Sequence, residues 1–539
     1  MIRNPILPGF NPDPSICRAG EVYYIATSTF EWYPGVQIHA SRDLVNWDLA
    51  CRPLNRAAQL DMRGNPDSCG IWAPCLSHAD GLFWLVYTDV KRLDGNFKDA
   101  HNYIVTAPDI AGPWSDPVYV NSHGFDPSLF HDDDGRKWFL TLQWNHRSES
   151  FGGHPRHPAF DGILLQEWVP GVGLTGTARV IFEGSAHGLT EGAHLYKRDG
   201  WYYLTVAEGG TGYDHAVTMA RSRHIAGPYE LHPDVHLVTA KDAPDWPLQR
   251  AGHGQIVETP DGQVYHTHLC SRPLPGRFSP CGRETAIQRC EWRDDGWLYL
   301  AEGGPLPQVE VAPPAPAVRR PDGPVARRFD GDALPPEFQW LRTPHPERIF
   351  TLTGQALRLI GRESIGSWFE QALVARRQEH LRYRAETTLT GFHPTTYQQA
   401  AGLTTYYNRH KFHFAAVTWE PGLGRALTIL SCPGDWPDGR LSFPVGPQPV
   451  AEGPVHLAVE VDGAEQRFFW RQVGDWQALG PVLDAAVISD EGGRGEHASF
   501  TGAFVGMAAF DITGQGLAAD FTDFGYAPAP DSADSQEKT

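Results

Sequence analysis

The sequence is poor in cysteine and has no long apolar run. Its eight cysteines stand at irregular spacings in 539 residues, without a C-x-x-C pair, so neither a zinc site nor a disulfide framework is indicated. We expect free thiols; pairing of Cys69 with Cys75, or of Cys281 with Cys290, is the minor alternative. The first ten residues carry two prolines and no apolar segment typical of a signal peptide. We therefore expect a cytoplasmic protein that does not cross a membrane.

Positive charge is also scarce. Lys and Arg number 45 against 64 Asp and Glu, a formal net charge of -19, which repels phosphate backbones and argues against a nucleic-acid partner. Such a field does not repel a neutral sugar. Aromatic residues, in contrast, are abundant at 12%. Most of them are expected to pack between strands, and a few are available for stacking on sugar rings.

A turn followed by an aromatic, β-branched run occurs five times in the first 300 residues. Four of the turns are Asp-Gly, a strong hairpin signal because glycine accepts the positive φ of the turn. The turn glycines lie 54 to 65 residues apart: Gly20, Gly81, Gly135, Gly200 and Gly262. Five four-stranded units at this period predict an all-β fold that begins with a five-bladed β-propeller over residues 1–305. A β-sandwich with accidental internal similarity is the alternative.

The remaining chain divides into three parts. Residues 306–324 belong to a proline-rich stretch that predicts a stiff, extended linker. Residues 325–527 show strand patterns without a repeat, which favours a β-sandwich. Residues 528–539 are polar and are expected to be disordered.

The repeat predicts which side chains meet in the propeller channel. The first strand of each blade lines the channel, so matching positions face one another. Counting nine residues back from the second to fifth turn glycines gives Trp72, Asp126, Glu191 and His253, and Asp13 lies seven before the first. Three carboxylates, one Trp and one His are thus expected around one end of the channel.

Three carboxylates in one channel suit glycoside hydrolysis. One carboxylic acid protonates the leaving oxygen and one carboxylate activates water. A third nearby carboxylate helps to keep the acid protonated, because like charges resist joint ionisation. Arg283, which heads the second strand pair of the fifth unit, is a candidate anchor for sugar hydroxyls; a salt bridge with Glu284 or another acid is its alternative role.

Several motifs together resemble family 43 glycoside hydrolases, in particular the two-domain β-xylosidases, over the chain to about residue 527. These motifs are Asn11-Pro-Asp-Pro-Ser-Ile-Cys17, Ser28-Thr-Phe-Glu-Trp-Tyr-Pro-Gly35, Ile71-Trp-Ala-Pro74, Gly124-Phe-Asp-Pro-Ser-Leu-Phe130, Leu189-Thr-Glu-Gly192 and Gly282-Arg-Glu-Thr-Ala-Ile-Gln288. The resemblance implies a five-bladed propeller followed by a concanavalin-like jelly-roll sandwich, and a mechanism that inverts the anomeric centre. It implies that Asp13 is the base, Glu191 the acid, and Asp126 the residue that tunes the acid and orients the substrate.

The same resemblance implies the walls of the pocket. Phe30, Trp72 and Trp144 would flank two sugar subsites, with blade packing as the alternative role for Trp144. Arg283 would contact the substrate. A phenylalanine from the sandwich would close the pocket and favour exo cleavage; Phe504 is the candidate. Phe500 is its rival.

His253 has two interpretations. The family resemblance implies that no cofactor is required, while in parts of this family a channel histidine helps to hold a metal ion, so a divalent cation such as calcium is an option. The preferred interpretation is a neutral histidine hydrogen-bonded in the channel, with no metal ligand.

These observations and the resemblance together imply an inverting exo-β-1,4-xylosidase acting on xylobiose and short xylooligosaccharides. The resemblance also implies assembly as a homo-oligomer, a dimer or a tetramer. Inversion requires the carboxyl groups of Asp13 and Glu191 to lie roughly 6.5–9.5 Å apart, so that water fits between them and the substrate. The alternatives are an α-L-arabinofuranosidase, an enzyme with both activities, and a sugar-binding propeller without catalysis.

Overall fold

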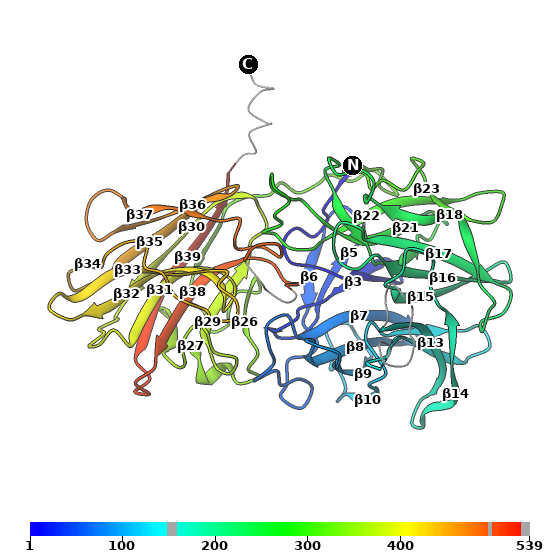
Figure 1. Cartoon of the computed structure of the whole chain (residues 1–539), viewed down its shortest axis with the longest axis horizontal. Helices are drawn as coiled ribbons and strands as arrows, with labels where there is room; N and C mark the ends of the chain where they lie inside the picture. The colour runs from blue at the N-terminus through cyan, green and yellow to red at the C-terminus, as the bar shows by residue number, and fades with distance from the viewer. Residues whose placement is uncertain (148–158, 494–498, 530–539) are drawn as a thin grey trace, which may run out of the picture.

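The protein consists of two β domains that lie side by side (Figure 1). This computed structural model describes residues 1–147, 159–493 and 499–529. In these ranges the single-turn helix η1 (Pro346–Arg348) is the only helical element, and no helix is long and apolar enough to cross a membrane. The all-β prediction is confirmed.

The first domain is the predicted five-bladed propeller. Blades one to four are four-stranded antiparallel sheets, and in blade five the innermost strand is broken into two, which gives five strands. Blade one consists of β2 (Ser15–Ala19), β3 (Val22–Thr27), β5 (Gln37–Ser41) and β6 (Asp48–Cys51), and blade two of β7 (Gly70–Ala79), β8 (Leu82–Arg92), β9 (Asp99–Ala107) and β10 (Val118–Asn121). Blade three consists of β11 (Ser128–His131), β12 (Lys137–Trp144), β13 (Phe160–Val169) and β14 (Gly173–Phe182), and blade four of β15 (Glu191–Arg198), β16 (Trp201–Glu208), β17 (Ala216–Ser222) and β18 (Glu230–Thr239). Blade five consists of β19 (Gln249–Gly252), β20 (Ile256–Glu258), β21 (Val264–Ser271), β22 (Glu284–Trp292) and β23 (Leu298–Leu300).

The turn glycines sit in two kinds of hairpin. All five have positive φ, between 61° and 84°, as the sequence predicted. In blades two and four, Asp80-Gly81 and Asp199-Gly200 form two-residue loops in which both residues have positive φ, the type I′ geometry that matches strand twist. In blades three and five, the paired strands end on either side of the five-residue loops 132–136 and 259–263.

The N-terminal segment closes the propeller. It runs beside β22 of the fifth blade, where Leu7 bridges Thr285 and the Asn11 N–H donates to the Arg283 carbonyl at 3.0 Å. The strand β1 (Ile2–Arg3) pairs with β24 (Glu310–Val311). This closure brings Asp13, from the start of the chain, against Arg283.

Part of the stretch predicted as a linker is in fact attached to the propeller. β24 lies within residues 306–324, Val311 is buried, and the Asn4 amide donates to the Gln308 carbonyl at 2.8 Å. The sequence predicted a stiff, extended linker here, but not that residues within it would complete a two-stranded sheet.

The second domain is a concanavalin-like sandwich of two antiparallel sheets. An apolar core that includes Phe338, Leu357 and Leu457 fills the space between them. One sheet runs β27 (Phe350–Leu352), β28 (Leu357–Ile360), β39 (Ala518–Pro528), β30 (Arg382–Thr390), β35 (Val455–Asp462), β36 (Glu465–Arg471) and β37 (Gln477–Asp484), with β25 (Val325–Arg328) also paired to β39; the other runs β34 (Gln448–Pro449), β33 (Gly424–Pro433), β32 (Lys411–Glu420), β31 (Gln399–Asn408), β38 (Phe504–Asp511), β29 (Ala372–Arg377), β26 (Phe338–Leu341) and β4 (Trp32–Tyr33). β39 reaches Pro528, and the rest of the predicted tail, from residue 530 on, lies outside the described residues.

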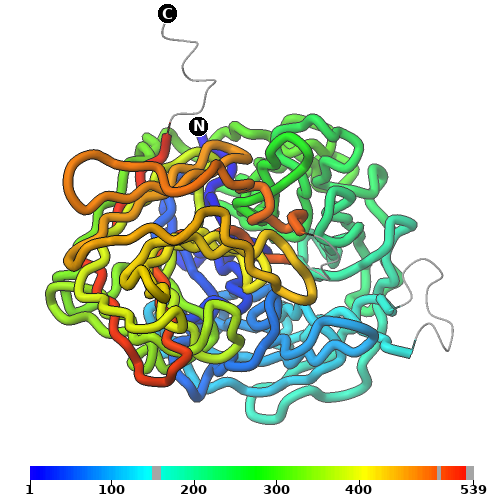
Figure 2. Tube along the Cα trace, turned by 60° about the vertical axis from the view of Figure 1, so that its left-hand side comes forward, coloured from blue at the N-terminus to red at the C-terminus, as the bar shows by residue number. Residues whose placement is uncertain are grey.

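The two domains share a sheet and a core. β4 belongs to the propeller but extends a sandwich sheet by pairing with β26. The Trp32 ring stacks on Phe504 of β38 with ring centroids 3.6 Å apart, inside one apolar cluster that draws on both domains. In the second view the sandwich lies across the propeller, near its N-terminal segments (Figure 2). The two domains are therefore joined by a shared sheet and a shared apolar cluster.

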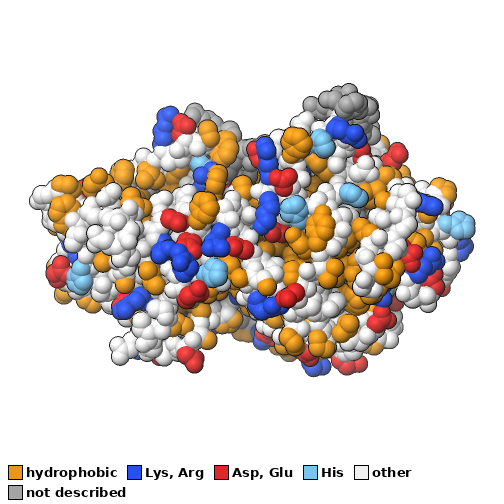
Figure 3. Space-filling view, turned by 90° about the horizontal axis from the view of Figure 1, so that it is seen from below, with side chains coloured by type: hydrophobic (Ala, Val, Ile, Leu, Met, Phe, Trp, Pro, Cys, Tyr) orange, Lys and Arg blue, Asp and Glu red, His pale blue; other side chains and the backbone are white. Residues whose placement is uncertain are grey.

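The structure shows the state of the cysteines and the distribution of charge on one face. All eight cysteines are free thiols, so the expectation of no disulfide is confirmed. On the face seen in Figure 3, acidic and basic side chains intermingle over both domains.

Candidate active site

One residue with positive φ lies in or just before the innermost strand of every blade: Asp13 (56°), Ala73 (23°), Asp126 (55°), Gly192 (58°) and His253 (41°). In blades two and four this residue falls in a β-bulge of the strand. In blades one, three and five the backbone pairing on its two sides is also offset by one residue, as in a bulge. Bulges bend a strand and redirect its side chains, and they often occur beside active sites. The propeller therefore repeats the same backbone bulge five times around its channel.

This bulge corrects the counting from the turn glycines. The bulge residue lies seven, eight, nine, eight and nine residues before the five successive turn glycines. Counting back nine reaches the bulge in blades three and five, where the loop is long. In blades two and four, with two-residue turns, it reaches the residue before the bulge, which is Trp72 or Glu191. Glu191 thus faces the channel from one position before the matching site of Asp13 and Asp126.

Asp13 is held as a carboxylate. Its Oδ1 accepts from Arg283 Nη1 at 2.9 Å and lies 3.4 Å from His253 Nδ1, while its Oδ2 accepts from Ser28 Oγ at 2.7 Å. Burial opposes ionisation, but Arg283, His253 and Ser28 outweigh it and hold the pKa of Asp13 well below its usual range. The salt-bridge alternative for Arg283 is realised, with Asp13 as the acid.

Glu191 is held in the opposite state. Burial, reinforced by the negative charge of Asp13, raises its pKa to about 8, against the opposing effect of Arg283 and Lys98. Burial and the charge of Glu191 also raise the pKa of Asp126 well above its usual value. At neutral pH the site therefore combines an ionised Asp13 with a protonated Glu191.

His253 sits between two carboxylates. Burial disfavours its charged form, but Asp13 and Asp126 outweigh burial and raise its pKa. Its ring packs on the backbone of Gly192, where an added Cβ would come within 2.7 Å of His253 Cδ2. The glycine after Glu191 is therefore required both by positive φ and by this close approach.

The surroundings of His253 bear on the option of a divalent cation in the channel. In the described part of the chain, no group of three or more His, Cys, Asp or Glu side chains is arranged to hold a metal ion. Calcium prefers six to eight oxygen ligands, whereas the Asp13 oxygen nearest His253 already accepts from Arg283.

The three carboxyls open into a cavity of about 280 Å³. Of the predicted site residues, all but Phe504 line it. The lining consists of Asp13, Phe30, Trp72, Leu93, Lys98, Phe125, Asp126, Trp144, Phe160, Glu191, Gly210, Thr211, His215, His253, Arg283 and Phe500. Aromatic side chains thus surround the carboxyls, as expected for a site that stacks on sugar rings.

The prediction that Phe504 closes the pocket is wrong. Phe504 begins β38, is fully buried, and stacks on Trp32 in the domain interface. Phe500, the rival, lies in the loop before this strand, with its ring centroid 5.9 Å from that of Trp72 and 6.4 Å from that of Phe30. Its carbonyl accepts from Arg283 Nη2 at 3.0 Å, so the sandwich reaches the guanidinium that holds Asp13.

Ser68 holds two walls of the cavity together. Its hydroxyl oxygen accepts from the Phe500 N–H at 3.1 Å, and its carbonyl accepts from Trp72 Nε1 at 2.9 Å. Its own N–H donates to Glu31 at 3.2 Å. One serine in a loop of the propeller therefore fixes a propeller wall and the sandwich wall.

Several lining residues were not predicted. Lys98 Nζ lies 4.5 Å from the Trp144 ring centroid and donates to the Leu93 carbonyl at 2.9 Å. Phe125 and Phe160 pack against Trp144. Phe125 precedes the Asp126 bulge, the equivalent of Trp72 and Glu191, and was detectable with the corrected register. Lys98 follows a loop between strands, and the sequence repeat does not extend to this loop, so it could not predict that Lys98 lines the cavity.

Comparison with known proteins matches both domains. Residues 2–298 match the family model for glycosyl hydrolases family 43, and residues 326–527 match the model for the β-xylosidase C-terminal concanavalin A-like domain.

Full-length relatives share the same two-domain extent. Xylosidase/arabinosidase 43B of Humicola insolens is 57% identical over 100% of this chain and 99% of its own length. The β-xylosidase of Bacillus subtilis (strain 168) is 46% identical over 97% and 99%. The crystal structure of xylan β-1,4-xylosidase from Bacillus halodurans C-125 superimposes with a TM-score of 0.93 at 47% identity, covering 98% of this chain and 100% of the other.

Proposed function

Because the chain belongs to family 43 of the glycosyl hydrolases, we propose that it is an inverting, exo-acting β-1,4-xylosidase that releases xylose from xylobiose and short xylooligosaccharides. The observation that carries this proposal is the opposite protonation of two carboxyl groups in one aromatic cavity. Asp13 is stabilised as a carboxylate, and the pKa of Glu191 is raised to about 8.

Each carboxyl group then has one role. Glu191 donates its proton to the bridging oxygen as the glycosidic C–O bond breaks. Asp13 accepts a proton from the water that attacks the anomeric carbon from the opposite face, which inverts the centre. Asp126 faces the same cavity, and burial together with the charge of Glu191 raises the pKa of Asp126 well above its usual value.

The size and lining of the cavity support a short neutral substrate. A cavity of about 280 Å³ is small, and its polar groups are few and convergent, as in sites for small ligands. The faces of Phe30, Trp72 and Phe500 are available for stacking on sugar rings. Phe500, supplied by the second domain, narrows the cavity and supports cleavage from a chain end.

A second candidate is an enzyme that also releases α-L-arabinofuranose. The relative at 57% identity carries both activities in its name, and the two pentoses present similar hydroxyl geometry to a small pocket. The ratio of rates on the two aryl glycosides distinguishes a strict xylosidase from a bifunctional enzyme.

The test compares wild type, Asp13→Asn and Glu191→Gln on 4-nitrophenyl β-D-xyloside, 4-nitrophenyl α-L-arabinofuranoside and xylobiose. We expect wild-type turnover on the xyloside and xylobiose, and a loss of about 10²- to 10⁴-fold in the Asp13 variant. Asp134→Asn, in an exposed turn of the propeller, is the matched control and should keep full activity.

NMR of the first product tests inversion, since a β-xyloside must yield α-xylose. First release of β-xylose would exclude the inverting mechanism. Binding of xylobiose without turnover by wild type would instead identify a sugar-binding module.

A further inference from the structure

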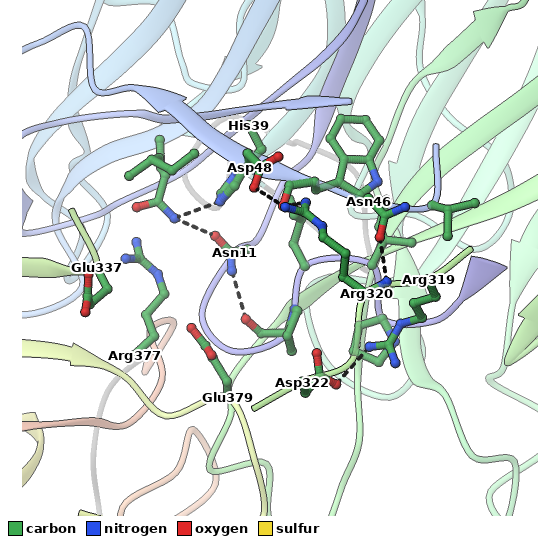
Figure 4. Close-up of a pocket in the computed structure, with 18 of the residues that line it drawn as sticks. Asn11, His39, Asn46, Asp48, Arg319, Arg320, Asp322, Glu337, Arg377 and Glu379 are labelled. Carbon is green, nitrogen blue, oxygen red and sulfur yellow. Dashed lines mark hydrogen bonds and ion pairs between the residues drawn. The ribbon is translucent and has the colours of Figure 1, made fainter. Parts of the chain in front are cut away.

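A second, larger cavity of about 490 Å³ lies between the propeller and the sandwich. It shares no lining residue with the cavity that holds Asp13. Blade one, the N-terminal segment, the stretch after β24 and the sandwich all contribute to its walls. Arg377 lies on the opposite side of this cavity from Arg319 and Arg320 (Figure 4).

Two arginines in its wall hydrogen-bond only to neutral groups. Arg377, from the sandwich, donates to the Phe10 carbonyl and the Gln339 side chain, both at 2.5 Å. It is 4% exposed, and its Nη2 has no partner among the described residues. Arg52, from the propeller, donates to Gln37 Oε1 at 2.7 Å and to the Phe338 carbonyl at 3.4 Å.

The carboxylates of the same wall are already paired. Asp48 pairs with Arg320 and Asp322 with Arg319. The other two acids pair with arginines outside the lining: Glu337 with Arg327 and Glu379 with Arg376. Among the described residues, Arg52 and Arg377 therefore have no carboxylate within ion-pair distance.

His39 adds a further donor. Gln37 Oε1 accepts from Arg52, so its Nε2 is the donor toward His39 Nε2, at 3.4 Å. His39 Nδ1 then carries the ring proton, and this buried atom has no partner in the described part of the chain. Burial and the charges of Arg377 and Arg52 lower the pKa of His39 to about 3, so the ring is neutral.

Buried guanidinium groups are normally paired, because an uncompensated buried charge is costly. Planar guanidinium groups match the oxygens of carboxylates and phosphates better than any other side chain does. We propose that this interdomain cavity binds a small oxyanion, a phosphate or a carboxylate, between Arg52 of the propeller and Arg377 of the sandwich. Because the two arginines come from different domains, the bound anion stabilises the interface.

The test is isothermal titration of the full chain with inorganic phosphate, acetate and citrate, each against chloride at equal ionic strength, together with the melting temperature. We expect saturable binding of at least one of these anions and a rise in melting temperature on binding. Binding of phosphate alone identifies tetrahedral chemistry, and binding of acetate or citrate identifies carboxylate chemistry; either supports the site.

Arg52→Met and Arg377→Met should each weaken that binding by about tenfold or more, since a charge-assisted hydrogen bond contributes roughly 1.5–3 kcal/mol. Arg358→Met, an exposed arginine paired with Asp520, is the control and should bind as wild type. Arg52→Met carries the test if Arg377→Met does not fold. No saturable binding of any of these anions to wild type, or unchanged binding in Arg52→Met, would overturn the proposal, whatever the outcome for xyloside hydrolysis.

Discussion

The two domains contribute to the cavity in different ways. The propeller supplies all three carboxyls around one backbone feature, a bulge repeated in every blade: Asp13 and Asp126 stand at the bulge, and Glu191 stands one residue before the bulge residue Gly192. Blades two and five carry Ala73 and His253 at the bulge. Of the residues that the structure describes, the sandwich supplies one lining residue, Phe500. A repeated scaffold can vary its chemistry blade by blade, whereas a partner domain acts through individual contacts. We therefore expect propeller substitutions to affect proton transfer and sandwich substitutions to affect substrate fit.

The largest effect is expected for Glu191→Gln with a poor leaving group. Xylobiose needs a proton on its bridging oxygen, so its turnover should fall by about 10²- to 10⁴-fold. 4-Nitrophenolate leaves with little help, and turnover of the aryl xyloside should fall much less. Steady-state rates on both substrates measure the difference. Equal losses on both would contradict the role of Glu191 as the acid.

Phe500→Ala and Phe504→Ala compare a cavity wall with a core residue of the same domain. Phe500→Ala should raise KM for xylobiose by about tenfold, the equivalent of roughly 1.4 kcal/mol of lost contact, with little change in melting temperature. Phe504→Ala should lower the free energy of unfolding by about 3–5 kcal/mol, because Phe504 is buried against Trp32. Denaturant titration and steady-state kinetics separate the two effects. A raised KM in Phe504→Ala and a lowered stability in Phe500→Ala would instead identify Phe504 as the cavity wall.

A smaller effect is expected for Ser68→Gly. Glycine keeps the positive φ of this position but removes the hydroxyl that accepts from Phe500 N–H. Loss of one hydrogen bond of about 1 kcal/mol should raise KM about fivefold without changing the pH profile. Ser77→Gly on β7, which removes a hydroxyl hydrogen-bonded to His131 of β11, is the control. A change in the pH profile would show that Ser68 acts on the carboxyls instead.

The smallest effect is expected for Lys98→Met, as a shift of the alkaline limb of the pH–rate profile. In wild type, kcat/KM should fall as pH rises through about 8, because Glu191 then loses the proton that it donates. Lys98 opposes the rise in that pKa, so Lys98→Met should move the limb to higher pH. A pH–rate profile of both proteins measures the shift, and a move to lower pH would refute the electrostatic role of Lys98.

Much of the fold was readable from local patterns. Aromatic strands and turn glycines at a regular period identified five blades, because each blade has a hairpin with a positive-φ glycine between its first two strands. The same period placed Asp13, Asp126 and His253 at matching positions. Trp72 and Glu191 were found one position away, because the lengths of the outer turns and the inner bulges both vary and counting from the turn does not separate them. The expected homo-oligomer and cytoplasmic location stay predictions.

The residues that close the cavity could not be placed in this way. Phe500 and Phe504 are four positions apart in one segment, and only the pairing of β38 with its neighbours buries Phe504 and leaves Phe500 at the cavity. Ser68 and Lys98 lie outside the repeat, so nothing in their local sequence indicates what they contact.

The amino-acid sequence determined the all-β architecture, the number of blades and the identity of the three carboxyls, because strand period, turn chemistry and repeat are local properties. The tertiary structure decided the protonation of those carboxyls. Asp13 and Glu191 are both buried, and the approach of Arg283, brought about by closure of the propeller, acts together with His253 and Ser28 to make Asp13 a stable carboxylate. Chain segments some 270 residues apart must meet before the site has an acid and a base, and no local pattern encodes that meeting.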